Sequence, residues 1–550
     1  MPEPANRDAM FPKLTQSQMA RLEGFGRRRT ASAGEIIYEP GDSKPGFFVL
    51  FSGRIEIVSP TSEGETLVTL HEAGEFTGEL NMLTGRHSLV RGRAAEDSEL
   101  IDIPSENLRR IVQTDAELSE ILLRAFLLRR SYLIANVPGG LLLIGSSHSA
   151  DTLRLRGFLT RNGQPHAYID VERDSGVQDL LSQFQIELSD IPVLICGSSR
   201  PLKNPSNADA AVYLGLNEGI EQGIIYDLIV VGAGPAGLAA GVYAASEGLS
   251  VLVLEGAAPG GQAGSSSRIE NYLGFPTGIS GQELAARAFV QAEKFGAHVA
   301  IAQTATRLYC ERHPYQIALA DGSTVRSRAI IIATGAEYRK LPLANVARFE
   351  GAGIYYGATH VEAQLCQDEE IVIVGGGNSA GQAAVFLSQK AKHIDVLIRG
   401  ESLAASMSQY LIRRIDECPT ITLRPRTEVE SLEGNGRLER IRWRNTATGQ
   451  SETHDIHHLF SMTGASPNSS WLDGCVALDD KQFVKTGADL TSEELSQWQW
   501  PLRRHPYLFE TSIPRVFAVG DVRSGSVKRV ASSVGEGSVA VQLVHRALAE

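Results

Sequence analysis

Two glycine-rich loops constrain the fold more than any other feature of this sequence, because each follows an apolar run and opens a helix-forming stretch. In the first loop, Gly232, Gly234 and Gly237 follow one apolar run, and the next apolar run ends in Glu255. This order of strand, loop, helix and strand is typical of a dinucleotide-binding unit. We expect the helix N-terminus to hold a pyrophosphate and Glu255 to accept ribose hydroxyls.

The second loop predicts a second nucleotide with a different ribose. Gly375, Gly377, Asn378 and Ala380 follow another buried-strand pattern, and the next apolar run ends in Arg399 instead of an acid. A carboxylate would repel a 2′-phosphate, whereas a guanidinium pairs with it, so NADPH is favoured over NADH. Two more basic residues on the following helix either add to this site or are ordinary solvated charges: Arg413 and Arg414.

Two dinucleotide units in one chain, the second inserted in the first, indicate that one nucleotide donates hydride to the other. A later segment supports this interpretation, since Gly520 and Asp521 end a strand-like run near the C-terminus, where the carboxylate can reach a flavin ribityl group or phosphate. Thr334 and Gly335 are typical of the crossover that leaves the first dinucleotide unit.

Residues 224–550 resemble the low-molecular-weight thioredoxin reductases, which are pyridine-nucleotide-disulfide oxidoreductases. Besides both glycine loops, the resemblance rests on the segments 259–262, 269–272 and 464–468. It implies non-covalent FAD, a homodimer, and a nicotinamide domain that swings relative to the FAD domain. The residues that it assigns to FAD, beyond those of the first loop, are Gly261, Gln262, Asn271, Thr334, Gly335, Gly520 and Asp521.

The redox pair of that family is missing here. Where the family carries Cys-Ala-Thr-Cys, this sequence has Gly357-Ala-Thr-His360. A disulfide relay needs two sulfurs, so we expect reduced FAD to pass its electrons directly to an unidentified acceptor, a small molecule or a redox protein. His360 is the candidate catalytic residue, as a proton or hydrogen-bond donor to reduced flavin, or else a partly exposed residue of a connecting helix. Cys366 is expected to be a small buried group.

The N-terminal segment 1–136 combines glycine-punctuated strands with a helical stretch at 106–135 and resembles cyclic-nucleotide-binding domains. Gly78, Glu79 and Leu80 match the phosphate-binding cassette of that family. The position of its phosphate-binding arginine is Ser88, with Arg86 nearby but out of register. Three interpretations therefore stay open: a cyclic nucleotide, another anionic ligand, or a purely structural β jelly roll.

The segment 137–220 resembles a thioredoxin or glutaredoxin fold. Strands are expected at 141–144, 167–171 and 191–195, with helices at 151–160, opened by an acidic cap, and at 177–184. Pro192 matches the cis-proline of that fold, but the loop Ser146-Ser-His-Ser149 has no cysteine. A spacer or docking platform is the favoured interpretation.

The fold class is therefore multidomain: a β jelly roll, an α/β thioredoxin-like unit, and two Rossmann-like α/β dinucleotide-binding domains. The predicted boundaries are 1–136, 137–220, 221–344 with 462–550 for FAD, and 345–461 for NAD(P)H. A net charge of −12 argues against nucleic acid as a partner. No apolar run could span a membrane, and we expect a cytoplasmic protein.

The cysteines exclude two further classes of site. Each lies more than fifty residues from the next, which excludes a CxxC pair and a short-spaced zinc site and fits a reducing compartment. No metal site is expected. The five positions are Cys196, Cys310, Cys366, Cys418 and Cys475.

These patterns predict a flavoprotein oxidoreductase in which NADPH reduces FAD, with activity gated by the N-terminal domain. Two alternatives stay open. One is a ligand and redox sensor with slow or vestigial flavin turnover. The other is an enzyme like the ferredoxin- or flavodoxin-NADP reductases of the thioredoxin-reductase type, which work without the cysteine pair.

Overall fold

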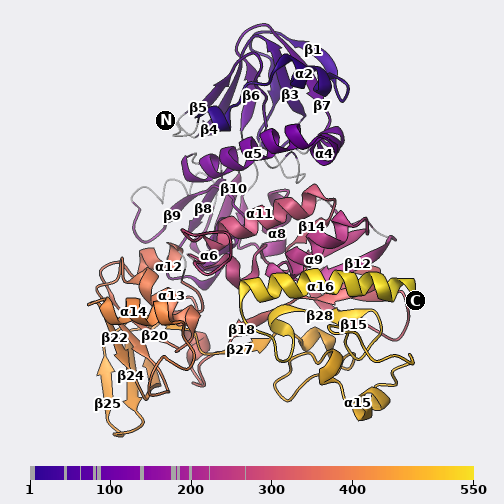
Figure 1. Cartoon of the computed structure of the whole chain (residues 1–550). Helices are drawn as coiled ribbons and strands as arrows, with labels where there is room; N and C mark the ends of the chain where they lie inside the picture. The colour runs from indigo at the N-terminus through magenta and orange to yellow at the C-terminus, as the bar shows by residue number, and fades with distance from the viewer. Residues whose placement is uncertain are drawn as a thin grey trace.

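The computed structural model comprises four units that follow one another along the chain, with the last inserted in the third (Figure 1). The structure describes residues 7–42, 46–61, 64–78, 82, 88, 90–136, 141–174, 181, 186–196, 201–217, 219–221, 223–266, 268–358 and 360–550.

The N-terminal unit contains two antiparallel sheets, followed by two helices. One sheet has the order β1-β7-β3 and the other the order β2-β6-β4-β5. The strands are β1 (Arg27–Ala31), β2 (Ile36–Tyr38), β3 (Phe47–Ser52), β4 (Ile55–Thr61), β5 (Gly64–His71), β6 (Arg91–Ala94) and β7 (Ser98–Ile103). The helices are α1 (Arg7–Met10), α2 (Gln16–Glu23), α4 (Ser105–Thr114) and α5 (Ala116–Asn136).

The helical stretch predicted at 106–135 was wrong in one respect, since it is two helices. Asp115 is extended between α4 and α5, with φ −114° and ψ 101°. Its Oδ1 accepts the backbone amide of Leu118 at 3.0 Å, so the aspartate caps the second helix. The two helices can therefore differ in direction, and α5 lies beneath the strands of the N-terminal unit (Figure 1).

The middle unit is a small four-stranded sheet with the order β11-β10-β8-β9. Strand β9 is parallel to β8, and β10 is antiparallel to both β8 and β11. The peptide bond between Ile191 and Pro192 is cis, as predicted. The elements are β8 (Leu141–Gly145), α6 (Ala150–Arg161), β9 (Ala167–Asp170), β10 (Val193–Cys196), β11 (Leu202–Lys203) and α8 (Asn207–Tyr213).

In the middle unit, the N-cap of α6 differs from the prediction. The predicted acidic cap of α6 was wrong, because Ser149 is the N-cap and its Oγ accepts the amide of Thr152 at 3.4 Å. Asp151 instead lies in the first turn, where a carboxylate also favours the helix dipole. The helix predicted at 177–184 lies outside the described residues apart from residue 181.

The first Rossmann unit is a seven-stranded sheet with the order β14-β13-β12-β17-β16-β15 and with β28 beside β17. Strands β12, β13, β14, β17 and β28 are parallel, which directs their carboxyl ends to one edge. The strands are β12 (Ile225–Val231), β13 (Val251–Glu255), β14 (His298–Ile301), β15 (Ala305–Tyr309), β16 (Tyr315–Leu319), β17 (Thr324–Ile332) and β28 (Val516–Ala518).

Helices α9 (Pro235–Ser246), α11 (Gly281–Lys294) and α16 (Val530–Ala549) belong to this unit. The C-terminal helix α16, yellow in Figure 1, runs along α9. The two helices approach closely at Gly537, since a Cβ there would lie 2.2 Å from the carbonyl oxygen of Ala236. The C-terminal helix is thus part of the support for the first glycine loop.

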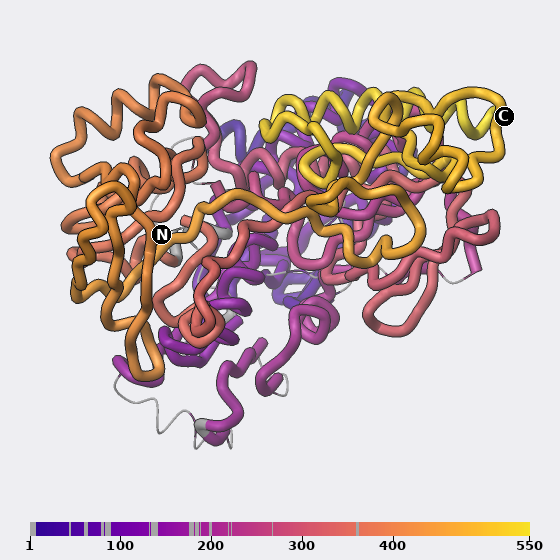
Figure 2. Tube along the Cα trace, turned by 90° about the horizontal axis from the view of Figure 1, so that it is seen from below, coloured from indigo at the N-terminus to yellow at the C-terminus, as the bar shows by residue number. Residues whose placement is uncertain are grey.

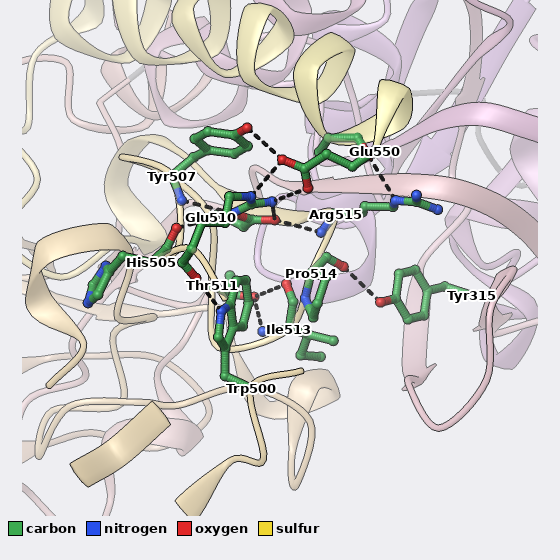
Figure 3. Close-up of polar contacts among 12 residues, drawn as sticks. Tyr315, Trp500, His505, Tyr507, Glu510, Thr511, Ile513, Pro514, Arg515 and Glu550 are labelled. Atoms are coloured by element: carbon green, nitrogen blue, oxygen red, sulfur yellow. Dashed lines mark hydrogen bonds and ion pairs between the residues drawn. The ribbon is translucent and has the colours of Figure 1, made fainter. Parts of the chain in front are cut away.

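The end of α16 is fixed by a network of charges centred on the buried Glu510 (Figure 3). Glu510 has no exposed surface and accepts Arg504 Nη1 at 2.6 Å. The same guanidinium donates to Glu550 through Nε at 2.7 Å and Nη2 at 2.8 Å. Glu510 also accepts the backbone amides of Tyr507 and Arg515. This network ties α16 to the segment that leads into β28 and Asp521.

The second Rossmann unit is a five-stranded parallel sheet with the order β19-β26-β20-β21-β22 and an added antiparallel sheet β23-β24-β25. It is inserted between β18 (Ala336–Tyr338) and β27 (Ala465–Pro467), which pair with each other. Figure 2 shows the two Rossmann units as separate lobes. The other strands are β19 (Ile354–Tyr355), β20 (Glu370–Val374), β21 (His393–Leu397), β22 (Ile421–Arg424), β23 (Thr427–Glu433), β24 (Arg440–Asn445), β25 (Ser451–His454) and β26 (His458–Ser461). The helices are α12 (His360–Leu365), α13 (Asn378–Leu387) and α14 (Gln409–Glu417).

Cysteine pairing differs from what the spacing suggested. Cys310 and Cys475, which are 165 residues apart in sequence, form a disulfide within the first Rossmann unit. Cys196, Cys366 and Cys418 are free. Among the described residues there is no cluster of three or more His, Cys, Asp or Glu that could hold a metal. No described helix is both long and apolar enough to cross a membrane.

Candidate active site

The first glycine loop has the close packing that its pattern predicted. Gly232 has φ 104°, and a Cβ on it would lie 2.4 Å from the carbonyl oxygen of Ala333. A Cβ on Gly237 would lie 1.8 Å from the carbonyl oxygen of Gly232. Gly234 is the N-cap of α9 and has no side-chain cap. Among the described residues, a Cβ added to Gly234 would come within 4 Å of Gly261 Cα alone, at 3.9 Å. The first turn of α9 therefore fits a phosphate group.

Glu255 is held at the end of β13 by three backbone amides. Its Oε2 accepts the amide of Ala233 at 2.8 Å. Its Oε1 accepts the amides of Ala257 at 2.9 Å and Ala258 at 3.2 Å. The carboxylate thus joins the first glycine loop to the loop that follows β13, at the carboxyl edge of the sheet. Its contact with a ribose stays a prediction.

Several residues assigned to FAD by resemblance form hydrogen bonds where β18 and β27 join the two Rossmann units. Gln262 Nε2 donates to the carbonyl of Ala336 in β18. Thr334 Oγ1 donates to the carbonyl of Asn468 at 2.7 Å, and Asn468 Nδ2 donates back to the carbonyl of Thr334 at 3.0 Å. The remaining residues of this set lie nearby along the chain or at the surface. Gly261 begins α10 (Gly261–Gly264), Gly335 has φ 66°, and Asn271 is exposed in the loop before α11.

Gly520 and Asp521 follow β28, and α16 fixes their turn. Gly520 has φ 72°, and its amide donates to Glu536 Oε2 at 2.7 Å. Glu536 also pairs with Arg523 at 2.7 Å. Burial raises the pKa of Asp521, while Lys528 acts in the opposite direction. Sequence reasoning missed Glu536 and Arg523, because only the packing of α16 brings them to the turn.

The second glycine loop repeats the geometry of the first. Gly375 has φ 145°, and a Cβ on it would lie 2.5 Å from the carbonyl oxygen of Met462. Gly377 is the N-cap of α13 without a side-chain cap, and a Cβ on it would meet no atom within 4 Å. Asn378 Oδ1 accepts the amide of Ser408 at 2.7 Å. Ala380 is buried. This helix N-terminus also fits a phosphate.

The basic residues near the second loop have different environments. Arg399 is exposed directly after β21, at the carboxyl edge of the sheet. Arg414 Nη1 lies 2.6 Å from Glu270 Oε2 in the first Rossmann unit. Arg414 therefore bridges the two units, whereas Arg399 and Arg413 are both exposed and have no ion pair with a described residue.

Tyr338 lies in β18, which pairs with β27 where the second Rossmann unit joins the first. Burial raises the pKa of Tyr338, the Ser379 hydroxyl lowers it, and the Asp521 carboxylate raises it. Ser379 lies in the first turn of α13, beside Gly377, and Asp521 follows β28. Groups from both Rossmann units therefore influence the Tyr338 hydroxyl.

The segment that replaces the cysteine pair lies before α12. A Cβ added to Gly357 would meet no atom of the described residues within 4 Å, and Ala358 is buried. Thr359 lies outside the described residues, and His360 begins α12, its side chain outside the description. The catalytic role of His360 therefore stays a prediction. Cys366 is fully buried, as expected, and burial, with Glu362 and Glu369, raises the pKa of its thiol.

Helix α6 of the middle unit contacts both Rossmann units, which sequence reasoning did not predict. At its C-terminal end, Arg161 Nη2 donates to the carbonyls of Ala258 at 3.3 Å and Gly261 at 3.1 Å. Near its middle, Arg156 Nη2 donates to Gln364 Oε1 in α12 at 2.8 Å. Two further contacts support the same docking. Ala150 lies against Gly351, and Leu153 packs on the core of the second Rossmann unit.

In the N-terminal unit, the structure describes two residues of the predicted ligand site, Gly78 and Ser88. Gly78 has φ 98°, a conformation that favours glycine, and a Cβ on it would clash with Met82. Ser88 is buried, and its hydroxyl donates to the carbonyl of Val90 at 2.8 Å. The other three residues of this prediction lie outside the described residues: Glu79, Leu80 and Arg86.

Comparison with known proteins decides the family. The family model for pyridine nucleotide-disulphide oxidoreductases matches residues 226–547. The chain belongs to this family. A second model, for the cyclic nucleotide-binding domain, matches residues 28–115. The chain is thus an NAD(P)H-dependent flavoprotein oxidoreductase of the thioredoxin-reductase type, fused to a cyclic-nucleotide-binding domain.

Individual relatives cover the oxidoreductase part alone. The thioredoxin reductase of Mycolicibacterium smegmatis is 32% identical over 327 residues, covering 59% of this chain and 97% of the relative. That of Bacillus subtilis (strain 168) is 30% identical over 326 residues, covering 59% and 96%. Among solved structures, the thioredoxin reductase of Lactococcus lactis aligns with a TM-score of 0.53 at 25% identity, covering 59% and 99%. That of T. acidophilum gives 0.52 at 26% identity, with the same coverage.

Proposed function

We propose that NADPH reduces FAD in this oxidoreductase, and that the electrons leave directly to an external acceptor, a small molecule or a redox protein. The observation that carries the proposal is the pair of glycine loops that leave an uncapped helix N-terminus in each of two Rossmann units joined through β18 and β27, combined with the absence of sulfur from residues 357–360. When bound, FAD accepts hydride from NADPH and releases two electrons to the acceptor.

The residues of this chain bind and orient the two nucleotides. In the first Rossmann unit, proposed as 221–344 with 462–550, Gly234 and Glu255 hold the pyrophosphate and ribose of FAD, and Asp521 approaches the ribityl chain. In the second, 345–461, the N-terminus of α13 holds the pyrophosphate of NADPH and Arg399 its 2′-phosphate. Positioning supplies most of the rate, so no protein nucleophile is required.

The middle unit, 137–220, is proposed as a thioredoxin-like domain that docks instead of reacting. Its sheet order, its cis Ile191–Pro192 bond and its serine-rich loop support this interpretation. Because α6 contacts α12 and the loop 257–261 together, it holds one relative orientation of the Rossmann units. We propose that the N-terminal domain, 1–136, gates activity through this docking. A homodimer is proposed from the family.

Anaerobic stopped-flow mixing with NADPH tests the proposal. The FAD-loaded chain should lose its visible flavin absorbance within the turnover range of ordinary enzymes, on the order of 1–10³ s⁻¹. The reduced protein should then fail to support thioredoxin-linked disulfide reduction. FAD that stays oxidised with NADPH bound would refute the proposal and favour the sensor. Disulfide reduction at a comparable rate would refute direct transfer to another acceptor.

A further inference from the structure

The C-terminal end of α6, in the middle unit, lies on the loop that follows β13 in the first Rossmann unit. Arg161 Nη2 donates to the carbonyls of Ala258 at 3.3 Å and Gly261 at 3.1 Å. Its neighbour Asn162 donates through Nδ2 to the carbonyl of Ala257 at 3.2 Å. Two consecutive residues of one unit therefore hold the backbone of residues 257–261 in another.

This loop borders both positions at which the first Rossmann unit is proposed to bind FAD. A Cβ on Gly261 would lie 3.1 Å from Gly234 Cα, and Gly234 is the N-cap of α9. The amide of Ala258 donates to Glu255 Oε1 at 3.2 Å. The two carbonyls that Arg161 contacts thus belong to residues that touch the proposed pyrophosphate and ribose positions.

The first Rossmann unit supplies no cation from these two loops. Residues 232–237 and 257–264 contain no Lys, Arg or His, and Glu255 adds a negative charge. The pyrophosphate of FAD carries further negative charge. The N-terminus of α9 contributes only about half an elementary positive charge, and like charges that lie close together in a partly buried site are unfavourable. Arg161, which is always protonated, lies beside the loop and offsets them.

The guanidinium of Arg161 has an unused buried donor. Its Nε is buried and has no hydrogen-bond partner among the described residues, whereas both hydrogen bonds to the loop come from Nη2. A buried donor without a partner costs free energy, and the planar N–H groups of a guanidinium suit phosphate oxygens. Arg154, on the same helix, differs in this respect, since its Nε, Nη1 and Nη2 all donate within the middle unit.

We propose that Arg161 is an FAD-binding residue that the middle unit contributes to the first Rossmann unit. Its guanidinium offsets the charge of the pyrophosphate and fixes the 257–261 loop beside it. The inference rests on the proposed binding of FAD to the first Rossmann unit, but not on the reduction of FAD by NADPH. Because the FAD site is complete only when α6 is docked, FAD and docking stabilise each other by the same factor.

Titration of the full chain, freed of flavin, with FAD measures the contribution of this charge. Flavin fluorescence gives the Kd in 0.01 M and in 1 M NaCl, where the screening length is about 30 Å and about 3 Å. Arg161→Met removes the charge, and Arg161→Lys keeps it. Arg154→Met is the matched control for loss of a charge from α6. Gln282→Ala is the control for loosened docking, because Gln282 Nε2 donates to the carbonyl of Thr160, near the end of α6, at 2.6 Å.

In 0.01 M NaCl, Arg161→Met should raise the Kd of FAD about fivefold relative to the wild type, and in 1 M NaCl less than about twofold, because salt screens the lost attraction. Arg161→Lys, Arg154→Met and Gln282→Ala should each stay within about twofold. The inference is overturned if Arg161→Met has no effect in 0.01 M NaCl, if its effect is the same at both salt concentrations, or if Gln282→Ala weakens FAD as much. Thermal transitions check folding, and should Arg161→Met not fold, Arg161→Gln takes its place.

Hydrogen–deuterium exchange measures the linkage between FAD and docking. In 0.01 M NaCl, exchange of the α6 amides should fall about fivefold when FAD is added to the flavin-free wild type, and this fall should be absent from Arg161→Met. Equal protection of both proteins by FAD would overturn the inference. Neither assay contains NADPH, so a flavin that binds as expected but is not bleached by NADPH contradicts the proposed function alone.

Discussion

The docking of α6 onto the second Rossmann unit gives the sharpest prediction of this structure. Arg156→Ala removes the donor, and Gln364→Ala removes the acceptor, of the hydrogen bond that joins α6 to α12. Arg154→Ala is the matched control on the same helix. The Arg154 guanidinium bonds Asn207 Oδ1 and the carbonyl of Pro205, each at 2.8 Å, within the middle unit itself. Only the first two substitutions should therefore loosen the docking.

The magnitude follows from the geometry of this bond. A hydrogen bond from a charged donor contributes about 1.5–3 kcal/mol when desolvated. The Arg156–Gln364 bond is exposed, so about 1 kcal/mol is the appropriate estimate. That free energy corresponds to a roughly fivefold rise in the equilibrium constant for undocking. Arg156 also lies 4.8 Å from the ring centre of Tyr168, an interaction within the middle unit that Gln364→Ala leaves intact.

Hydrogen–deuterium exchange of the full chain measures undocking directly, because amides protected by docking exchange in proportion to the open population. Exchange in α6 and in residues 350–356 should rise about fivefold in Arg156→Ala and in Gln364→Ala. The double variant should add little to either one. Flavin reduction by NADPH should slow in the same variants. Equal exchange in Arg154→Ala and Arg156→Ala, or simple additivity in the double variant, would refute the docking contact.

Three further outcomes are expected. Arg399→Ala should raise the Kd of NADPH about tenfold, because it removes the proposed contact with the 2′-phosphate. The Kd of NADH should change by less than about twofold. Fluorescence titration measures both constants, and equal effects on the two nucleotides would contradict the prediction. Gly237→Ala should abolish FAD binding, because its Cβ would lie 1.8 Å from a carbonyl oxygen, whereas Gly535→Ala in α16 meets no atom within 4 Å and should leave the flavin spectrum unchanged. Burial lowers the pKa of His71 and of His458 to about 4; the unfolded chain therefore binds more protons between pH 4 and about 6.5, and stability rises with pH across that window. From pH 7 to 5 each should cost about 2 kcal/mol, so calorimetric transitions should shift less in His71→Asn and His458→Asn than in the wild type.

The sequence was most informative where structure follows from local pattern. The two glycine loops could be placed because strand, loop and helix are adjacent in the chain, and each glycine meets a steric demand that neighbouring residues create. Gly232 and Gly375 both have positive φ and no room for a Cβ. The cis bond before Pro192 was likewise predictable from a short motif.

What the sequence did not predict depends on contacts between distant segments. Glu536 fixes the turn before Asp521 only because α16 packs on α9. The Cys310–Cys475 disulfide joins residues 165 positions apart, with no spacing motif to indicate it. Arg414 was considered for the second nucleotide site because it lies on the helix that follows Arg399. In the structure it pairs with Glu270 of the first Rossmann unit instead.

The same long-range contacts suggest how an N-terminal ligand could influence the flavin site. Arg130 of α5 donates to the carbonyl of Gly163, just after α6. Asn162, the neighbouring residue, donates to the carbonyl of Ala257 at 3.2 Å, in the loop that Glu255 organises. A path of contacts is not by itself a coupling, since a ligand shifts an equilibrium only by its differential affinity for two states. The docked and undocked forms of α6 supply two such states, so a ligand of the N-terminal domain regulates this enzyme only if its affinity differs between them.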